Sequence, residues 1–438
     1  MTSSLPPAAI RATVSDTFFA PLQEAAQGNP HSRRCPAISD DMWLQLGVRR
    51  VLEQESSGRG FVQAMSDGGH ANIAVSSLFD NLSSKRRLLT SRWSAQALQQ
   101  QVDRQRLKYD PLAKYSCLDA FAIFAGDGHY HEKATHDLAR YEHDTATQHF
   151  YALDLRTHAL RHITAAMTGP EIDEEKVNVI RKRENDMHAI KRIGPDAMRL
   201  NTPCGRKVLH VWDRACIDLP LWANFKARHG IYFISRLKDL MILNKQKDFD
   251  FDSNDPINAG IESDISALSG NSSPIRLITY VCPATGVRYQ YITSENTLPP
   301  GIIAYLYKMR WDIEKVFDEV KIKCGEKKSW GSSPETKEVQ AHFICIAHNL
   351  MLLLEDRLAD ENRIANERET ARKIQRAEFL KAKATKAGRI FAPMYQQINR
   401  LSQRCVPFIR WLRNHLRSRG LWNQSLADLR HIYGVPVR

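Results

Sequence analysis

Residues 120–128 read Ala-Phe-Ala-Ile-Phe-Ala-Gly-Asp-Gly, an apolar run that ends at a carboxylate between two glycines. A short apolar run bounded by glycine predicts a buried strand followed by a loop, so Asp127 is expected where the strand ends. A second run of the same form, Val208-Leu-His-Val-Trp212, ends directly at Asp213. Two buried strands that each end at an aspartate predict a sheet edge where loops can gather polar side chains.

The elements around these two strands follow from apolar periodicity and from capping residues. They are strands at 150–155, 160–165 and 231–237, and helices at about 174–200 and 218–230. Three strands, a helix, and then strand, helix and strand is the element order of the ribonuclease-H-like α/β fold. We therefore expect a ribonuclease-H-like core formed by residues 111–246 and 299–355.

The segments that flank this core differ from it in pattern. Residues 1–35 carry few periodic apolar positions and predict a flexible tail. Ser39 can cap a helix, and apolar residues at helical spacing follow it, so residues 36–110 predict a helical DNA-binding domain. Residues 247–298 predict a mostly β insertion, in which a long acidic loop over 247–274 precedes a β-hairpin at 275–281 and 287–293.

Positive charge is concentrated at the C-terminal end. The net charge is +13, and residues 361–438 hold 17 Lys and Arg against 5 Asp and Glu. A soluble protein this basic usually binds a polyanion, most often nucleic acid, although an idle cationic surface is the alternative. We expect residues 356–438 to form a basic helical segment.

Arginines and aromatic residues are interleaved in this segment. A helix there would dock an apolar side on protein, through residues that include Phe408, Trp411, Leu416 and Trp422. Its other side is predicted to contact DNA phosphates through Arg400, Arg404, Arg410, Arg413, Arg417 and Arg419. Dimer contact through the aromatic side is the second possibility. In the N-terminal helices the candidate phosphate contacts, each of which could also lie on a solvated face, are Lys85, Arg86, Arg87 and Arg92.

Some classes of protein are disfavoured. The eight cysteines are scattered without a Cys-x-x-Cys pair, which argues against a zinc finger and against a disulfide framework. The sequence begins with no signal-peptide pattern, and its most apolar stretch is too short to span a bilayer. We expect a cytoplasmic protein with no membrane partner.

A long helical pattern opens at Pro299-Pro300-Gly301 and reaches Lys323, with Gly325 placed to end it. Tyr307, Glu314 and Lys321 lie seven residues apart, so each is displaced by only about 20° from the one before. Arg310 falls on the same side of the helix. The four side chains are expected to share one face, although Arg310 and Glu314 could also form a simple surface ion pair.

The run Tyr307-Lys-Met-Arg310-Trp-Asp-Ile-Glu314, followed by Lys321, resembles the Tyr-Arg-Glu-Lys signature of the insertion sequence four family of bacterial DDE transposases. The resemblance implies two upstream aspartates, one after the first strand and one after the fourth, and Asp127 and Asp213 stand there. It implies that Asp127, Asp213 and Glu314 are catalytic and bind metal. It also implies that Tyr307, Arg310 and Lys321 bind DNA.

Three carboxylates suit phosphodiester chemistry, because two divalent ions can activate the attacking hydroxyl and neutralise the leaving oxygen. Mg²⁺ prefers such oxygen ligands. The resemblance implies two Mg²⁺ ions, with Mn²⁺ as a substitute, in a nucleoid-associated enzyme of cut-and-paste DNA transposition. Its partners would be double-stranded DNA, as transposon ends with inverted repeats and as target, and a second copy in a synaptic complex. A stand-alone nuclease of the same fold and an inactive or domesticated DNA-binding derivative are the alternatives.

A group of histidines gives a competing interpretation of part of the core as a zinc site. These residues are His129, His131, His136, His143 and His149. Their spacing fits no standard pattern of zinc ligands, so the sequence disfavours this interpretation.

Overall fold

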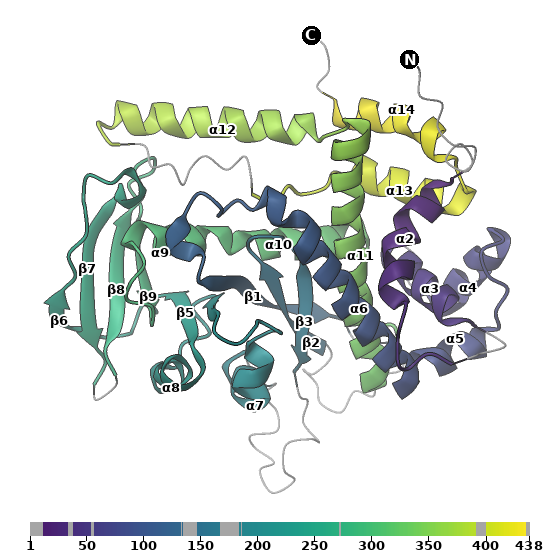
Figure 1. Ribbon diagram of the computed structural model, residues 1–438, viewed down its shortest axis with the longest axis horizontal. Helices are drawn as coiled ribbons and strands as arrows, with labels where there is room; N and C mark the ends of the chain where they lie inside the picture. Colours follow the sequence, from purple (N-terminus) through teal and green to yellow (C-terminus); the bar gives the residue numbers. More distant parts are fainter. Residues whose placement is uncertain are drawn as a thin grey trace, which may run out of the picture.

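The computed structural model describes residues 12–33, 38–53, 57–132, 134, 147–166, 184, 186–270, 273–390 and 400–434. A nine-stranded sheet with the order β3-β2-β1-β4-β5-β9-β8-β7-β6 runs through it. Figure 1 shows this sheet at the left and centre, with most of the N-terminal helices and the last two helices gathered at the right. The mixed α/β architecture expected from the sequence is confirmed.

Five strands form the part of the sheet that carries the two aspartates. They are β1 (Phe121–His131), β2 (Thr147–Asp154), β3 (Leu160–Ala165), β4 (Lys207–Val211) and β5 (Ile231–Arg236). β1 pairs antiparallel with β2 and parallel with β4, which in turn pairs parallel with β5. Alternate side chains of β1 point to opposite faces, so that Ile123 and Ala125 join one apolar core while Ala122 and Phe124 join another.

β1 is longer than the sequence predicts. Asp127 was expected in a loop, but the strand continues through it and pairs it with Tyr151 of β2. The flanking glycines serve close packing instead of a turn: a Cβ at Gly126 would come within 2.5 Å of the Trp212 ring, and one at Gly128 would meet the side chain of Gln148.

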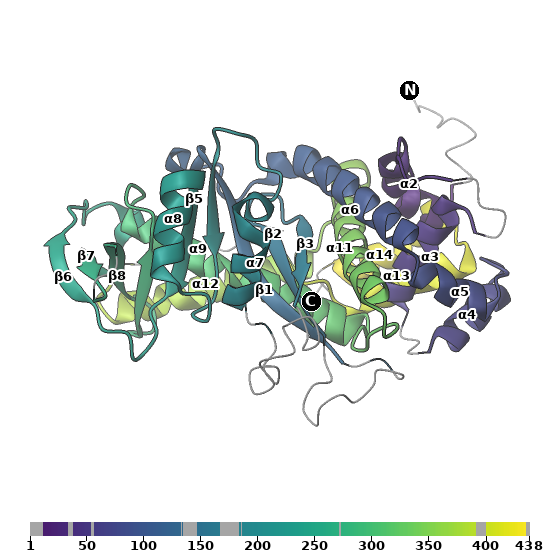
Figure 2. The same cartoon turned by 90° about the horizontal axis from the view of Figure 1, so that it is seen from below.

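Helices cover both faces of the sheet (Figures 1 and 2). α7 (Asp186–Met198) and α8 (Leu219–His229) pack on one face, and α9 (Pro300–Met309) and α10 (Trp311–Asp318) pack on the other. α8 begins after the cap Asp218 and ends at Gly230, which has φ 62°, as predicted. The catalytic-helix candidate is divided at Arg310 into α9 and α10 and finishes in a π-helical turn, η5 (Glu319–Lys323), before Gly325.

The insertion is a continuation of the same sheet. It contributes β6 (Asn244–Asp248), β7 (Ile261–Leu268), β8 (Ile275–Val281) and β9 (Arg288–Thr293), and β9 pairs with β5. The predicted β8–β9 hairpin is confirmed, whereas the acidic loop expected over 247–274 is wrong in part because it contains β7. The polar composition of β7 conceals the strand: Asp264 is buried and accepts two hydrogen bonds from Arg276, at 2.8 and 2.5 Å.

The N-terminal region is helical, and its first helix corrects the prediction of a flexible tail over 1–35. Residues Val14–Ala26 form α2, which begins with a capping box between Thr13 and Asp16 and buries Phe18, Phe19 and Leu22. The expected helices follow as α3 (Asp40–Leu52), α4 (Gly58–Asp67), α5 (Val75–Leu82) and α6 (Lys85–Arg106). Two short 3₁₀ helices, η1 (Leu107–Tyr109) and η2 (Ser116–Leu118), follow α6, and another, η4 (Pro256–Asn258), lies in the insertion.

These N-terminal helices share one apolar core with the long helix α11 (Pro334–Asn362) and with the sheet. Three of their four candidate phosphate contacts are engaged within the protein. Arg86 and Arg87 both donate to Asp40, and Arg92 donates to Glu338. None of the described helices is both long enough and apolar enough to cross a bilayer.

The C-terminal helices are α12 (Glu367–Lys386), α13 (Val406–Ser418) and α14 (Trp422–Tyr433). Their aromatic side packs within this same chain, as expected for an apolar side that docks on protein, so it does not form the dimer contact given as the second possibility. Phe408, Trp411 and Trp422 are buried, and a bridge between Thr13 and Leu421 joins this region to the start of α2. Figure 1 shows α13 and α14 beside α2 accordingly.

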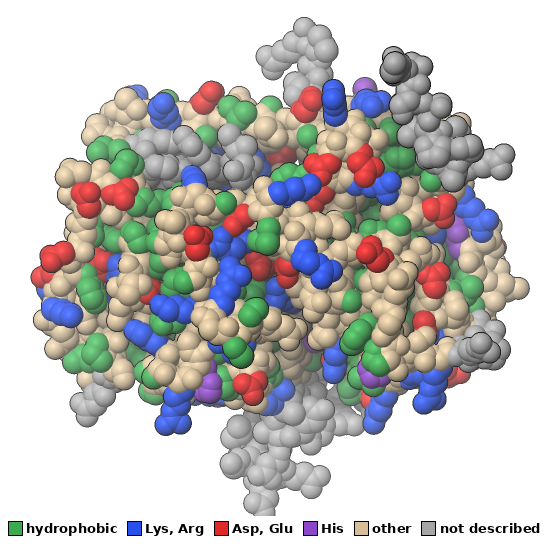
Figure 3. Space-filling view, viewed as in Figure 1, with side chains coloured by type: hydrophobic (Ala, Val, Ile, Leu, Met, Phe, Trp, Pro, Cys, Tyr) green, Lys and Arg blue, Asp and Glu red, His purple; other side chains and the backbone are tan. Residues whose placement is uncertain are grey.

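The free arginine face predicted for this segment is also corrected. Five of the six arginines are bonded to other parts of the chain. Three of them pair with carboxylates: Arg400 with Asp312, Arg404 with Glu319 and Glu355, and Arg417 with Glu53. The other two donate to backbone carbonyls, Arg413 to that of Leu52 and Arg419 to that of Gly69. Only Arg410 of this set is exposed without a described bond. On the face in Figure 3, Lys and Arg are interspersed with Asp and Glu. Carboxylates elsewhere in the fold therefore pair with Arg400, Arg404 and Arg417 of this set.

Candidate active site

The sheet places Asp127 and Asp213 side by side. Ala125 of β1 pairs with Val211 of β4, and the two strands are parallel. Each aspartate lies two residues beyond its member of that pair, so both occupy the same edge of the sheet. The structure contains the predicted juxtaposition of the two aspartates, but Asp127 lies within β1 and not at its end.

Glu314 reaches this edge from α10 through Arg310. Arg310 Nη2 lies 2.5 Å from Glu314 Oε1, and Nη1 lies 3.4 Å from Asp127 Oδ2. The Arg310 side chain is only 8% exposed. Burial disfavours its charge, but Asp127 and Glu314 outweigh burial and raise the pKa of Arg310. Arg310 therefore does not form a simple surface ion pair with Glu314 alone, because it bridges two carboxylates from different elements.

Burial and the neighbouring carboxylates change the pKa of Asp127. Burial raises the pKa of Asp127 to about 7, Arg310 opposes this rise, and the nearby Asp213 and Glu314 add to it. Among the described residues, Asp127, Asp213 and Glu314 do not form a group whose ligand atoms all lie within 4.8 Å of one another. The Arg310 guanidinium bonds to both Asp127 and Glu314.

The structure adds an acid that the sequence did not indicate. Asp186, the first residue of α7, lies beside Asp213 and Cys216, with one ligand atom of each within 4.8 Å of the others. Gln148 Nε2 donates to Asp186 at 3.0 Å. Burial and Asp213 together raise the pKa of Asp186, and burial keeps the Cys216 thiol protonated by raising its pKa. Asp186 follows no predicted strand and belongs to no motif, so no local signal marks it.

Of the remaining signature residues, Tyr307 lies beside Arg310, and Lys321 is near enough to His129 of β1 to lower its pKa further. The Tyr307 ring is half-buried, packs 4.9 Å from the Tyr291 ring and lies 5.8 Å from the Arg310 guanidinium. Burial raises the pKa of Tyr307, and Asp213 is near enough to add to that rise. Lys321 is exposed on the π-helical turn. That wider turn breaks the seven-residue register on which the shared face was predicted.

The histidines of the competing zinc interpretation divide into two sets. His136 and His143 lie outside the described residues. His129, His131 and His149 are buried, and burial lowers the pKa of each; His129 also stacks on Phe317 of α10, with ring centroids 4.7 Å apart. They form part of a longer row of imidazoles described below.

The raised pKa of Asp127 predicts a pH dependence of stability. The folded metal-free protein keeps this proton up to about pH 7, whereas the unfolded chain releases it near the ordinary value of 3.8. The contribution to stability is therefore complete below pH 3.8 and is lost as the pH rises through 7. Chemical denaturation in chelator should show that Asp127→Asn gains stability relative to wild type between pH 4 and 7, and levels off above. A constant difference across this range would contradict the assigned pKa.

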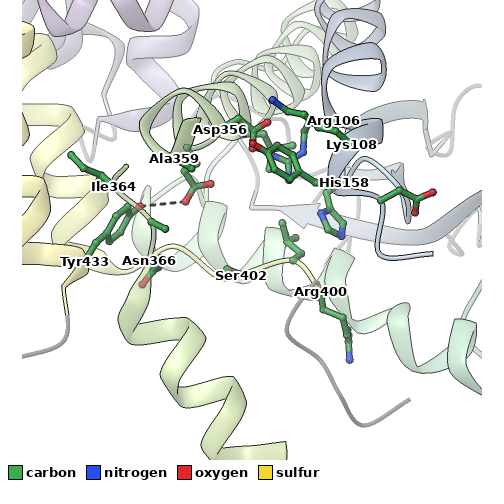
Figure 4. A pocket seen from close by; sticks show the side chains of 16 residues that line it. Arg106, Lys108, His158, Asp356, Ala359, Ile364, Asn366, Arg400, Ser402 and Tyr433 are labelled. Carbon is green, nitrogen blue, oxygen red and sulfur yellow. Dashed lines mark hydrogen bonds and ion pairs between the residues drawn. The ribbon is translucent and has the colours of Figure 1, made fainter. Parts of the chain in front are cut away.

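Cavity volume is no guide to this site. A cavity of about 400 Å³ lies elsewhere, between the end of α6, α11 and residues 400–402, and Arg106, His158 and Tyr433 help to line it (Figure 4). The dashed line in that view joins the Tyr433 hydroxyl to Glu355, 3.3 Å away. None of the residues that surround Asp127 lines this cavity.

Two aspartates on neighbouring strands and a helix-borne glutamate, which Arg310 bridges to Asp127, bring three carboxylates together at this part of the sheet. Residues 176–350 match the family model described as a transposase DDE domain. The matched segment includes Asp213, Tyr307, Arg310, Glu314 and Lys321, and it begins beyond Asp127. No curated protein matches the chain. The family match supports a DDE transposase, with DNA as the substrate that this family implies.

Proposed function

We propose that this protein is a cut-and-paste transposase that binds the inverted repeats of an insertion sequence and cleaves and joins DNA strands at the site formed by Asp127, Asp213 and Glu314. The observation that carries the proposal is the bridge that Arg310 makes between Asp127 and Glu314, at the sheet edge that Asp213 shares. Through this bridge Arg310 contacts Glu314, Tyr307 and Asp127, and Asp127 is the one of these residues that lies outside the matched segment.

The strand arrangement supports a ribonuclease-H-like core. β3, β2 and β1 form an antiparallel meander, and β4 and β5 add to it in parallel through helical connections. The insertion enters after β5 and returns to the core at α9, so it separates Asp213 from Glu314 in sequence while leaving both at one end of the core.

The donor set fits Mg²⁺ or Mn²⁺, because Asp127, Asp213 and Glu314 offer only hard oxygen ligands. Asp127 is buried and lies near two other carboxylates, so its charged form would be stabilised strongly by a bound cation. When bound there, two ions would activate the attacking hydroxyl and stabilise the leaving oxygen. The two aspartates would hold them from the rigid strands, and Glu314 would complete the set from α10.

The side chains around these acids would handle the DNA backbone. Arg310 already presents a guanidinium between carboxylates, and on DNA binding it would turn its fork to a phosphate beside the cleaved bond. Tyr307, fixed against Tyr291, would position the adjacent sugar-phosphate. Lys321 is exposed further along the same helical segment and would hold a phosphate away from the reacting atoms. A second copy of the chain would supply the partner end in a synaptic complex.

A metal-dependence experiment tests the proposal. Labelled duplexes that carry the inverted repeats flanking the gene should be cut with Mg²⁺ or Mn²⁺ and not in excess chelator. Ca²⁺ should permit binding without cleavage, because its looser geometry positions reacting atoms poorly. The measurements are denaturing gels for cleavage and a joining assay with target DNA. Undiminished cleavage in chelator would refute the metal site, and cutting without any joined product would indicate a stand-alone nuclease.

A further inference from the structure

A row of imidazoles extends across the sheet from β1, the strand that carries Asp127, to α11. It runs from His129 and His131 on β1, through His149 on β2 and His162 on β3, to His342 on α11. Successive ring centroids lie 4.9, 5.7, 5.1 and 5.1 Å apart. Such a concentration of nitrogen ligands is unneeded by an all-carboxylate Mg²⁺ site, so it calls for a separate explanation.

The α11 end of this row has the composition of a metal site. Glu338 and His342 are one helical turn apart, and His342 Nε2 lies 3.6 Å from Glu338 Oε1. His162 faces them from β3, which packs on α11. One ligand atom from each of His162, Glu338 and His342 lies within 4.8 Å of the other two. In addition, His149 Nδ1 lies 3.1 Å from His162 Nε2.

The ligand atoms of this group are held close together by packing and by charge. The His342 ring is buried on α11, and Glu338 is paired with Arg92 beside it. His342 Nε2 contacts Glu338 Oε1 at 3.6 Å, and within the described part of the chain this buried nitrogen has no closer hydrogen-bond partner.

A path to this position exists. A cavity of about 210 Å³ is lined by both His162 and His342, together with residues of α6 and β3. Arg92, which now holds Glu338, has a side chain that is 42% exposed and is therefore free to move aside. An ion in this cavity would meet His162 and His342, and it would reach Glu338 once Arg92 moves aside.

We propose that His162, Glu338 and His342 form a Zn²⁺ site that ties β3 to α11. Two imidazoles and one carboxylate are an established zinc donor set, and water would supply a fourth ligand. The site is distinct from the catalytic carboxylates in both its residues and its donor chemistry. It would brace the antiparallel edge of the sheet against the helix that also supports the N-terminal helices.

Cobalt substitution in the full-length protein tests this proposal. Chelator-treated protein is titrated with Co²⁺, whose tetrahedral complexes absorb strongly in the visible range, and Zn²⁺ is then added in competition. Wild type should bind one tetrahedral Co²⁺ that Zn²⁺ displaces. Glu338→Gln should weaken this binding by at least about tenfold. The matched control is Glu335→Gln, which alters a partly exposed glutamate of the same helix and should bind as wild type does.

Two further measurements separate the outcomes. Asp213→Asn should leave the cobalt band intact, whereas its loss would assign the ion to the acidic site and overturn the proposal. Zn²⁺ should raise the melting temperature of wild type and of Glu335→Gln, but not that of Glu338→Gln. Equal cobalt affinity in wild type and Glu338→Gln, or no tetrahedral band at one equivalent, would also overturn it. Because Glu338 is partly exposed, its variant is expected to fold, and the melting curve without metal verifies this.

Discussion

Asp213→Ala should abolish DNA strand cleavage while end binding stays within a few-fold of wild type. Asp213 would hold a metal ion and contributes little else to DNA affinity, since the phosphates are contacted by cations. Removing such a ligand loses several kcal/mol of transition-state stabilisation, so the cleavage rate should fall by at least about 10³-fold. Asp127→Ala and Glu314→Ala should behave in the same way. Single-turnover cleavage and gel-shift binding, measured on the same labelled end, give the two quantities.

Asp239→Ala is the matched control, because Asp239 also follows a strand near the site but is exposed and pairs with Arg214 at the surface. It should cut at the wild-type rate. Asp186→Ala distinguishes two roles for the additional acid: a loss as large as that of Asp213→Ala would make Asp186 a fourth ligand. If Asp213→Ala itself cuts at near the wild-type rate, then Asp213 holds no metal and the proposed site is wrong.

The parts of this protein that the sequence predicts well are those specified by local signals. The strand before Asp213 is a contiguous apolar run, and α8 is bounded by its own cap and by Gly230 in a left-handed conformation. The hairpin of β8 and β9 is likewise contained within about twenty residues. Each of these elements could be placed without knowledge of what packs on it, and the strand signals marked the two aspartates, whereas Glu314 was assigned through the resemblance of its helix to the family signature.

The parts that the sequence predicts poorly depend on partners far along the chain. β1 continues past Asp127 because β2 pairs with it, and β7 is hidden by an aspartate whose charge Arg276 neutralises. Asp186 reaches the site only through the packing of α7 against the sheet. The C-terminal arginines give the clearest case, because their number predicted a DNA-binding surface, whereas their acceptors belong to α10, η5, α11 and the end of α3.

Arg404→Met should therefore destabilise the protein by about 3–5 kcal/mol, the range for breaking a buried ion pair by removing one partner. Arg404 is 1% exposed; its Nη1 lies 2.6 Å from Glu319 and its Nε lies 2.8 Å from Glu355. Methionine fills much of the space but removes the cation that pairs with the buried Glu319 and with the partly exposed Glu355. The free energy of unfolding, from denaturant titration at pH 7, measures the loss.

Arg410 provides the control for the Arg404 variant, because it is a nearby arginine whose side chain is exposed. Arg410 is exposed on α13, so Arg410→Met should change stability by less than about 0.5 kcal/mol. The deficit of Arg404→Met should shrink as the pH falls, because protonation neutralises the stranded carboxylates. Adding Glu319→Gln and Glu355→Gln should restore much of the loss at pH 7, since the buried charges are then gone. Equal stability of the Arg404 and Arg410 variants would show that Arg404 is not engaged with these glutamates in solution. In that case the arginine would be free for DNA, and its variant should instead lower the salt dependence of DNA binding.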